Sequence, residues 1–283
     1  MRLSYLLLAG SLLAAPARAQ TVPGLPTDQV RLEAIYRLTY RPDSTAPATR
    51  SELMRLQLGS KVSRFESLTA VRGDSALKAQ FDASIAQSKA TGTVPTIKME
   101  ASYVSRFRGQ AIFKVPAGRQ VVTTDKIEQV PYVYTESSGP VWAIGTGTTT
   151  VAGYACQHAT TAWGGRTWEA WFTREVPIAD GPYKFYGLPG LIVQVIDTRQ
   201  HYTYTLAKLR QLPAPAPLEL PDAKSKPIAK AEFLQAKADN ARSTADRLLA
   251  SGNIRFNTPE EEASFRQKAR ERAKRPTNPI ELK

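Results

Sequence analysis

Alternating apolar and polar positions dominate the first two thirds of the chain and predict a β-rich protein. From residue 32 to residue 40, apolar side chains fill every second position (Leu32, Ala34, Tyr36, Leu38 and Tyr40), and polar ones fill most positions between them. This period of two is typical of a strand with one buried face. We expect further strands at residues 54–58, 62–68, 101–107, 111–114, 119–123, 132–136, 141–144, 148–157, 167–172, 191–196 and 202–209. Because mostly turn residues separate these runs, the pattern favours an antiparallel sheet.

Helical spacing appears at three places. Leu77, Phe81 and Ile85 recur every four residues and predict a helix over residues 74–90, whereas the Pro- and Ala-rich residues 212–227 suggest an extended connector. Two C-terminal helices are expected within residues 228–275, the second with Thr258 as N-cap and Glu261 in a capping box. We therefore predict an α+β fold, in which a mainly antiparallel, curved, half-barrel-like sheet packs with a few helices, two of them C-terminal.

The N-terminus has the layout of a secretory signal peptide. Met1 and Arg2 precede an apolar run to residue 15, and Ala17-Arg18-Ala19 forms a cleavage signal of small residues. We expect cleavage after Ala19, which leaves residues 20–283 as a single domain. No later run is long and apolar enough to predict a membrane span. The expected location is the periplasm or cell envelope, or the medium outside the cell.

Charge and cysteine content narrow the function classes. The 283 residues include 38 Lys and Arg against 25 Asp and Glu, which gives a formal net charge of +13. The basic residues are scattered and are not interleaved with aromatic ones as in single-strand binding patches, so no nucleic-acid partner is expected. The single cysteine, Cys156, rules out an intramolecular disulfide, and the fold must depend on an ordinary core.

A distinctive stretch runs from residue 153 to residue 197. It contains Gly153-Tyr-x-Cys156-x-x-Ala159, then Gly165-Arg-x-Trp168-x-Ala-Trp171, then Gly181-Pro-x-x-Phe185. The letters GLPGLI follow directly, at Gly187, Leu188, Pro189, Gly190, Leu191 and Ile192. With these motifs in this order, and with residues 278–282 also similar, the chain resembles the GLPGLI family. The resemblance implies an exported protein of Gram-negative bacteria and no settled activity.

The motif also has a local structural interpretation. In Leu188-Pro189-Gly190-Leu191, proline presets φ at the second position of a type II turn and glycine accepts the positive φ of the third. We expect a turn that fixes the register of the following strand. The functional alternative is a rigid loop at the mouth of a binding site.

Five residues near the motif are candidates for ligand binding: Arg166, Trp168, Trp171, Phe185 and Tyr186. On a strand, Trp168 and Trp171 point to opposite faces, which predicts a strand covered on both sides. The first interpretation is a core strand, with Arg166 capping a carbonyl or pairing with an acid such as Asp180. The alternative is an aromatic-lined pocket for an apolar ligand, with Arg166 at its rim.

Cys156 and His158 are the candidates for reactive chemistry. Two residues apart on a strand, they would share a face and could form a thiolate–imidazole pair. No third group to orient the pair is evident, and a free cysteine is most often a small buried side chain. With two histidines in all and no spacing typical of metal ligands, no metal is expected, and no motif calls for a cofactor.

Two functions of different classes lead, neither of them enzymatic, and an enzyme that uses Cys156 is the third and least favoured hypothesis. One is a carrier or sensor of an apolar ligand such as a lipid, by analogy with periplasmic lipoprotein carriers whose sheets curl around helices. The other is an accessory module that docks on an outer-membrane or other envelope protein. In that case the tail, residues 278–283, could add as a strand to the partner's sheet.

Overall fold

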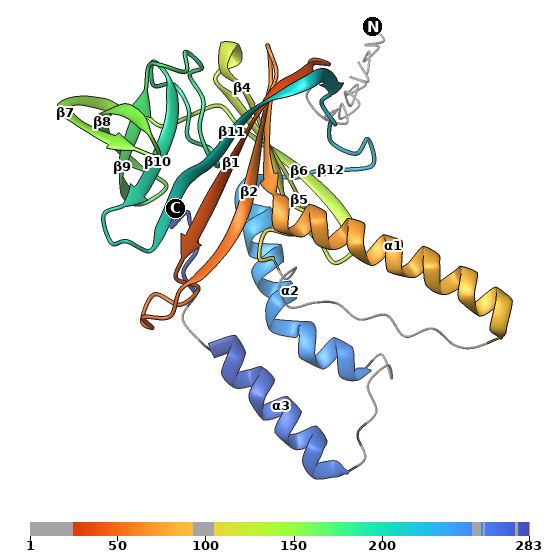
Figure 1. Ribbon diagram of the computed structural model, residues 1–283. Helices are drawn as coiled ribbons and strands as arrows, with labels where there is room; N and C mark the ends of the chain where they lie inside the picture. Colours follow the sequence, from red (N-terminus) through yellow and green to blue (C-terminus); the bar gives the residue numbers. More distant parts are fainter. Residues whose placement is uncertain (1–24, 93–104, 251–255, 257, 275–276, 283) are drawn as a thin grey trace, which may run out of the picture.

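The computed structural model describes residues 25–92, 105–250, 256, 258–274 and 277–282, in which twelve strands form one open sheet (Figure 1). All neighbouring strands are antiparallel except β12, which runs parallel to β6. The spatial order is β12-β6-β5-β4-β3-β2-β1-β11-β10-β9-β8-β7. The strands are β1 (Gln29–Tyr40), β2 (Arg50–Leu58), β3 (Ser63–Ser67), β4 (Ala111–Val115), β5 (Gln120–Ile127), β6 (Val130–Glu136), β7 (Ala143–Val151), β8 (Tyr154–Trp163), β9 (Arg166–Thr173), β10 (Leu191–Asp197), β11 (Tyr202–Pro217) and β12 (Lys226–Pro227).

The sheet consists of two meanders joined at their long strands. Strands β1 to β6 follow one another as neighbours, and β7 to β11 do the same. Strand β11 then returns beside β1, where Tyr40 faces Tyr202 and Gln29 faces Pro217. This one long pairing brings the two halves of the chain together. The prediction of a mainly antiparallel sheet with few helices is confirmed.

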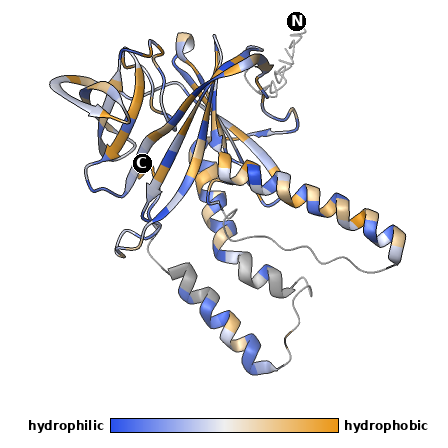
Figure 2. Cartoon of the chain, viewed as in Figure 1, coloured by the Kyte–Doolittle hydropathy of each residue, from blue (hydrophilic) through white to orange (hydrophobic). Residues whose placement is uncertain are grey.

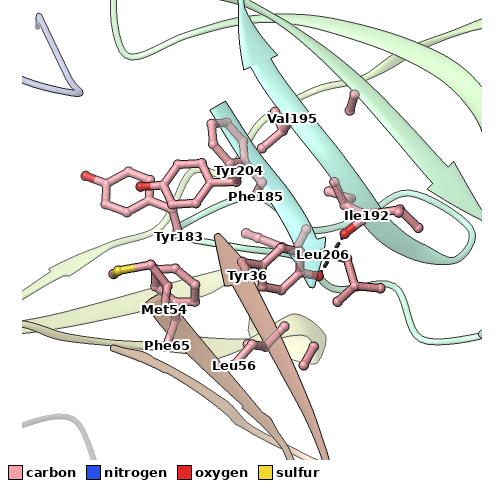
Figure 3. Close-up of a cluster of buried hydrophobic side chains, with 14 of the residues drawn as sticks. Tyr36, Met54, Leu56, Phe65, Tyr183, Phe185, Ile192, Val195, Tyr204 and Leu206 are labelled. Atoms are coloured by element: carbon pink, nitrogen blue, oxygen red, sulfur yellow. Dashed lines mark hydrogen bonds between the residues drawn. The ribbon is translucent and has the colours of Figure 1, made fainter. Parts of the chain in front are cut away.

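The main core lies on the inner face of β1 and its neighbours. The alternating residues Ala34, Tyr36 and Leu38 are fully buried, as the sequence pattern predicts. Figure 3 shows Tyr36 among the buried side chains of several strands, with its hydroxyl donating a 2.7 Å hydrogen bond to the carbonyl of Ile192. On β4, Ile112 joins this core and Phe113 a second cluster. Successive strand residues point to opposite faces, so β4 is covered on both sides.

Helix α1 (Leu68–Thr91) starts six residues earlier than the spacing predicts. The Ser67 hydroxyl caps it by accepting a 3.0 Å hydrogen bond from the Ala70 amide. Within α1 only Leu68, Ala70 and Gly73 are buried. The rest of the helix extends away from the sheet (Figure 1), and hydrophobic positions, coloured orange, recur along it (Figure 2).

Helix α2 (Lys230–Ala250) is attached to the sheet at its N-terminal end. Phe233 is buried between Tyr132 and Tyr134 of β6, at ring-centroid distances of 5.9 and 5.6 Å. Helix α3 (Pro259–Lys274) begins as predicted, because the Thr258 hydroxyl accepts a 3.3 Å hydrogen bond from the Glu261 amide. None of the helices in the described ranges is long and apolar enough to cross a membrane.

Three local predictions are wrong in detail. The strand expected at residues 148–157 is a hairpin, since Ala152 and Gly153 both have positive φ and turn the chain between β7 and β8. The expected connector at residues 212–227 instead prolongs β11 to Pro217 and later contributes β12. Of the strand expected at residues 101–107, residues 101–104 lie outside the described part, and residues 106–109 form a turn that precedes the short link to β4. A 3₁₀ turn, η2 (Pro116–Gly118), joins β4 and β5.

Candidate functional site

The GLPGLI motif forms a tight connection that leads into β10, but not through a type II turn. The Leu188 carbonyl accepts a 2.8 Å hydrogen bond from the Gly190 amide, two residues on, which is the pattern of a γ-turn around Pro189. Gly190 has φ +151°, and a Cβ added there would lie 2.0 Å from the carbonyl oxygen of Thr173. Glycine is therefore required because the backbone of β9 approaches closely, so that β10 can start against the end of β9.

Three of the four aromatic residues proposed for ligand binding, Trp168, Phe185 and Tyr186, are buried in the main core cluster. Trp168 and Phe185 are fully buried with ring centroids 4.7 Å apart, and Phe185 also lies 5.6 Å from Trp163. Tyr186 is buried, and its carbonyl accepts a 2.9 Å hydrogen bond from the Trp142 indole. These side chains fill the space that a ligand would need. Their role in ligand binding stays a prediction.

Strand β9 is covered fully on one face only. Trp168, Ala170 and Phe172 are buried, whereas Thr167 and Glu169 on the other face are exposed and Trp171 is half-buried. The prediction of cover on both sides is therefore wrong for most of the strand. Trp171 is left on an accessible surface.

Arg166 is buried and binds both an acid and backbone carbonyls, as the core-strand interpretation predicts, but the acid is Asp197 and not Asp180. Its guanidinium donates a 2.9 Å hydrogen bond to the Asp197 carboxylate and reaches the C-terminal tail, residues 277–282. There it donates to the carbonyl of Ile280 at 2.9 Å, and to the side chain of Asn278 and the carbonyl of Pro279 at 2.6 Å each. Arg166 is thus an internal clamp for the tail, and not the rim of a pocket.

The tail is fixed to the body of the protein and is not free to join a partner's sheet, contrary to expectation. Asn278 is buried, and its side-chain amide donates a 2.8 Å hydrogen bond to the Arg41 carbonyl. Its own carbonyl accepts a hydrogen bond from the Tyr202 hydroxyl. The Leu282 amide donates at 2.7 Å to Gly164 in the turn between β8 and β9. The apolar Pro279-Ile280 pair in a polar tail is the sequence signal that could have indicated this docking.

A neutral cluster of four charges lies beside the tail. Lys184, of which 1% of the side chain is exposed, is 2.7 Å from Glu281 and also bridges Glu136 of β6. Lys230, the first residue of α2, lies 2.6 Å from Glu136 and bridges Glu281. Burial opposes ionisation of Glu281, but the Lys184 charge and the hydrogen bonds to Glu281 outweigh it, and the pKa lies below its ordinary value. The cluster joins the segment 181–186, which precedes the GLPGLI letters, to β6, α2 and the tail.

Asp180, the partner expected for Arg166, instead forms a buried ion pair with Lys114 of β4. The ammonium nitrogen lies 2.5 Å from the carboxylate, and both side chains are almost inaccessible. Burial lowers the pKa of Lys114, and the Asp180 charge opposes this shift. The pair joins the two meanders across the core. No sequence pattern signals it, since 66 residues separate the partners.

Cys156 and His158 each have other partners in the structure, and their role as a reactive pair stays a prediction. Cys156 is buried, and burial raises the pKa of its thiol, which disfavours the thiolate. The His158 ring lies against Trp171, with centroids 4.8 Å apart, and its Nε2 is 3.9 Å from the Glu169 carboxylate. The described residues contain no group of three His, Cys, Asp or Glu side chains suited to a metal ion.

A separate cleft of about 370 Å³ lies at the start of α1. Its lining includes Glu66, Asp74 and Asp125 together with Arg64 and Lys126. Charges of both signs pair there, as in the 2.8 Å contact between Arg64 and Glu66. The cleft contains none of the residues that the sequence motifs single out.

Comparisons with known proteins identify one matching segment. Residues 163–194 match a family model described as "Protein of unknown function (Porph_ging)", and this segment contains the GLPGLI letters. Membership of the GLPGLI family itself is not confirmed by this match. No curated protein matches the chain.

Solved structures give distant matches. Two crystal forms of PNGF-II match at 9% identity and a TM-score of 0.49, and they cover 76% and 75% of this chain. The chain spans about a third, 34%, of the length of PNGF-II. A putative outer membrane lipoprotein-sorting protein domain from Vibrio parahaemolyticus matches at 9% identity and a TM-score of 0.25, over 67% of this chain and 87% of that domain. At these scores the matches carry no argument about function, and what the comparisons show is a segment, residues 163–194, typical of a family of unknown function.

Proposed function

We propose that this protein is an exported, non-enzymatic docking module of the cell envelope, which binds another envelope protein through helix α1. The exposed apolar face of α1 is the observation that carries the proposal. Leu77, Phe81 and Ile85 follow one another at intervals of four residues and so lie along one side of the helix. Phe81 is 51% exposed and Ile85 38% exposed, although both are large apolar side chains.

Among the described residues, most of α1 is not packed against the rest of the protein, and this supports a partner. The helix has 24 residues, but its buried residues all fall within the first six. Helices in proteins gain most of their stability from packing an apolar face, and isolated helices are marginal in water. A partner that covers the face of Leu77, Phe81 and Ile85 would supply this packing. An amphipathic helix laid into an apolar groove is a common mode of recognition.

The carrier hypothesis has less support, because Trp168 and Phe185 pack against each other where the ligand was expected. The enzyme hypothesis has less support again, because burial raises the pKa of Cys156. Export by residues 1–19 is part of the proposal and depends on their sequence alone. These residues lie outside the described part.

The test places a photo-crosslinking amino acid at Phe81 and, as a matched control, at Ala79 on the opposite side of α1. Both positions are exposed on the same helix, so only the face differs. We expect irradiation of intact cells to give one crosslinked product of defined mass from position 81 and none from position 79. Ile85→Glu should remove the product without lowering the melting temperature. Equal crosslinking from both positions, or none from position 81, would refute docking through this face.

A further inference from the structure

The two ends of the open sheet differ in how they are protected. At one end β12 has only two residues, Lys226 and Pro227. Short length, lysine and proline are the usual means of preventing an edge strand from pairing with another chain. At the other end β7 has nine residues, with no charged residue and no proline, and seven of them are exposed. Within the described residues β7 pairs with β8 alone, so its outer edge offers unpaired backbone groups.

Two glycines make a notch in this edge. The pairing of β7 with β8 is irregular between Ile144 and Thr148, where residues 145–147 lie opposite His158. A Cβ added at Gly147 would lie 3.4 Å from His158 and 3.8 Å from Trp171, and one at Gly145 would lie 3.4 Å from His158. The missing side chains therefore leave space over the place where the His158 and Trp171 rings meet. At this place 27% of the His158 side chain is exposed.

Neither the backbone nor the packing requires glycine at these positions. Gly145 and Gly147 do not have positive φ, and an added Cβ would make ordinary van der Waals contacts. Glycine within a strand is unfavourable in itself, and it often marks a place where a ligand or another backbone comes close. Nearby Val141 and Ile144 are 76% and 48% exposed, which adds apolar surface at the same edge. Open backbone, a notch and apolar flanks thus occur together on β7.

We propose that the β7 edge binds an extended segment of another protein. The segment pairs with residues 148–151 as an added strand and lays an aromatic side chain over Gly145 and Gly147, against His158 and Trp171. Main-chain pairing then supplies affinity, and the notch supplies specificity. An aromatic side chain placed across an edge glycine is an established way to cover it in a sheet.

A second copy of this chain fits the notch less well. It would bring its own β7, whose residues 145–150 are glycine and threonine only. These side chains are too small to cover the rings of His158 and Trp171. The inference concerns a surface distinct from α1 and does not depend on the function proposed for that helix.

The test is selection from a phage-displayed library of random peptides against residues 20–283, followed by affinity measurement with the selected peptides. We expect peptides in which an aromatic residue is flanked by β-branched ones. Gly147→Val, which fills the notch, should weaken binding about tenfold, the effect of losing one aromatic contact. Trp171→Ala should weaken it similarly, whereas Gly118→Val, far along the chain in η2, should not.

The melting temperature of each variant shows whether it folds. If Gly147→Val does not fold, the binding measurement on Trp171→Ala tests the proposal in its place. Unchanged binding by both notch variants would overturn the proposal, and so would a selection that enriches no peptide. Concentration-dependent dimers that Gly147→Val abolishes would replace the proposed partner by a second copy. Phe81→Ser in α1 should leave peptide binding intact. The peptide experiment therefore tests the β7 edge alone, and its outcome does not depend on whether α1 binds a partner.

Discussion

Arg166→Ala is the most informative single change, because one side chain connects β9, Asp197 and the tail. The variant removes one hydrogen bond to the Asp197 carboxylate and three to groups of the tail, together with a 3.4 Å contact to the His201 ring. Asp197 stays buried, with 1% of its side chain exposed, and it keeps a 2.7 Å hydrogen bond from the Tyr202 amide. The substitution therefore leaves a carboxylate in the interior without its cation.

The magnitude follows from the burial of both partners. Removing one partner of a buried ion pair costs about 3–5 kcal/mol, since the remaining charge is uncompensated. For a chain of this size, each kcal/mol lowers the melting temperature by about 2–4 °C, which gives a total of about 6–20 °C. Arg166→Lys keeps the charge but not the fork that reaches several acceptors, so we expect a smaller loss. Arg31→Ala, at an exposed position of β1, is the control and should change stability by less than about 0.5 kcal/mol.

Urea unfolding gives the free energy, and hydrogen exchange of the Leu282 amide reports the tail separately. That amide is bonded to the Gly164 carbonyl, and we expect its protection to fall in Arg166→Ala more than that of the sheet. A loss below about 1 kcal/mol with unchanged Leu282 protection would refute the role of Arg166 as a clamp.

Three further predictions concern Gly190, Glu281 and Cys156. Gly190→Ala brings a Cβ within 2.0 Å of the Thr173 carbonyl, so we expect a loss of at least about 1–3 kcal/mol in thermal unfolding, and an unchanged melting temperature would contradict the close approach. Because the folded-state pKa of Glu281 is below its ordinary value of 4.5, its ionised form stabilises the fold above that pH, and this stabilisation is lost as the pH falls through the lowered pKa. Glu281→Gln should therefore reduce the fall in melting temperature on acidification, and parallel curves of melting temperature against pH for the variant and the original protein would refute the effect. Cys156 should react slowly with Ellman's reagent at neutral pH and fully after denaturation, whereas rapid reaction of the folded protein would show that the thiol is accessible.

Local sequence signals predicted the elements well where the determining interactions are local. The alternation in β1 identified its buried face, and Thr258 identified the start of α3. Prediction of local structure failed where the same residues are compatible with two backbone conformations. The hairpin between β7 and β8 depends on a positive φ at Ala152, which alanine does not signal. The GLPGLI letters fit a type II turn, but the approach of Thr173 selects another geometry for Gly190.

The sequence by itself determined the β-rich class, the two C-terminal helices and the location of the motif, because periodicity and capping act over a few residues. Only the tertiary structure decided what the candidate residues do. Arg166 meets Asn278 across 112 residues, and Lys184 meets Glu136 across 48. These contacts arise because β11 returns beside β1 and the tail binds Gly164 and Arg166 at the start of β9. A charged residue in the sequence does not indicate which distant segment will supply its partner. The notch on β7 also depends on tertiary structure, because Gly145 and Gly147 leave space only where β8 and β9 place His158 and Trp171 next to them.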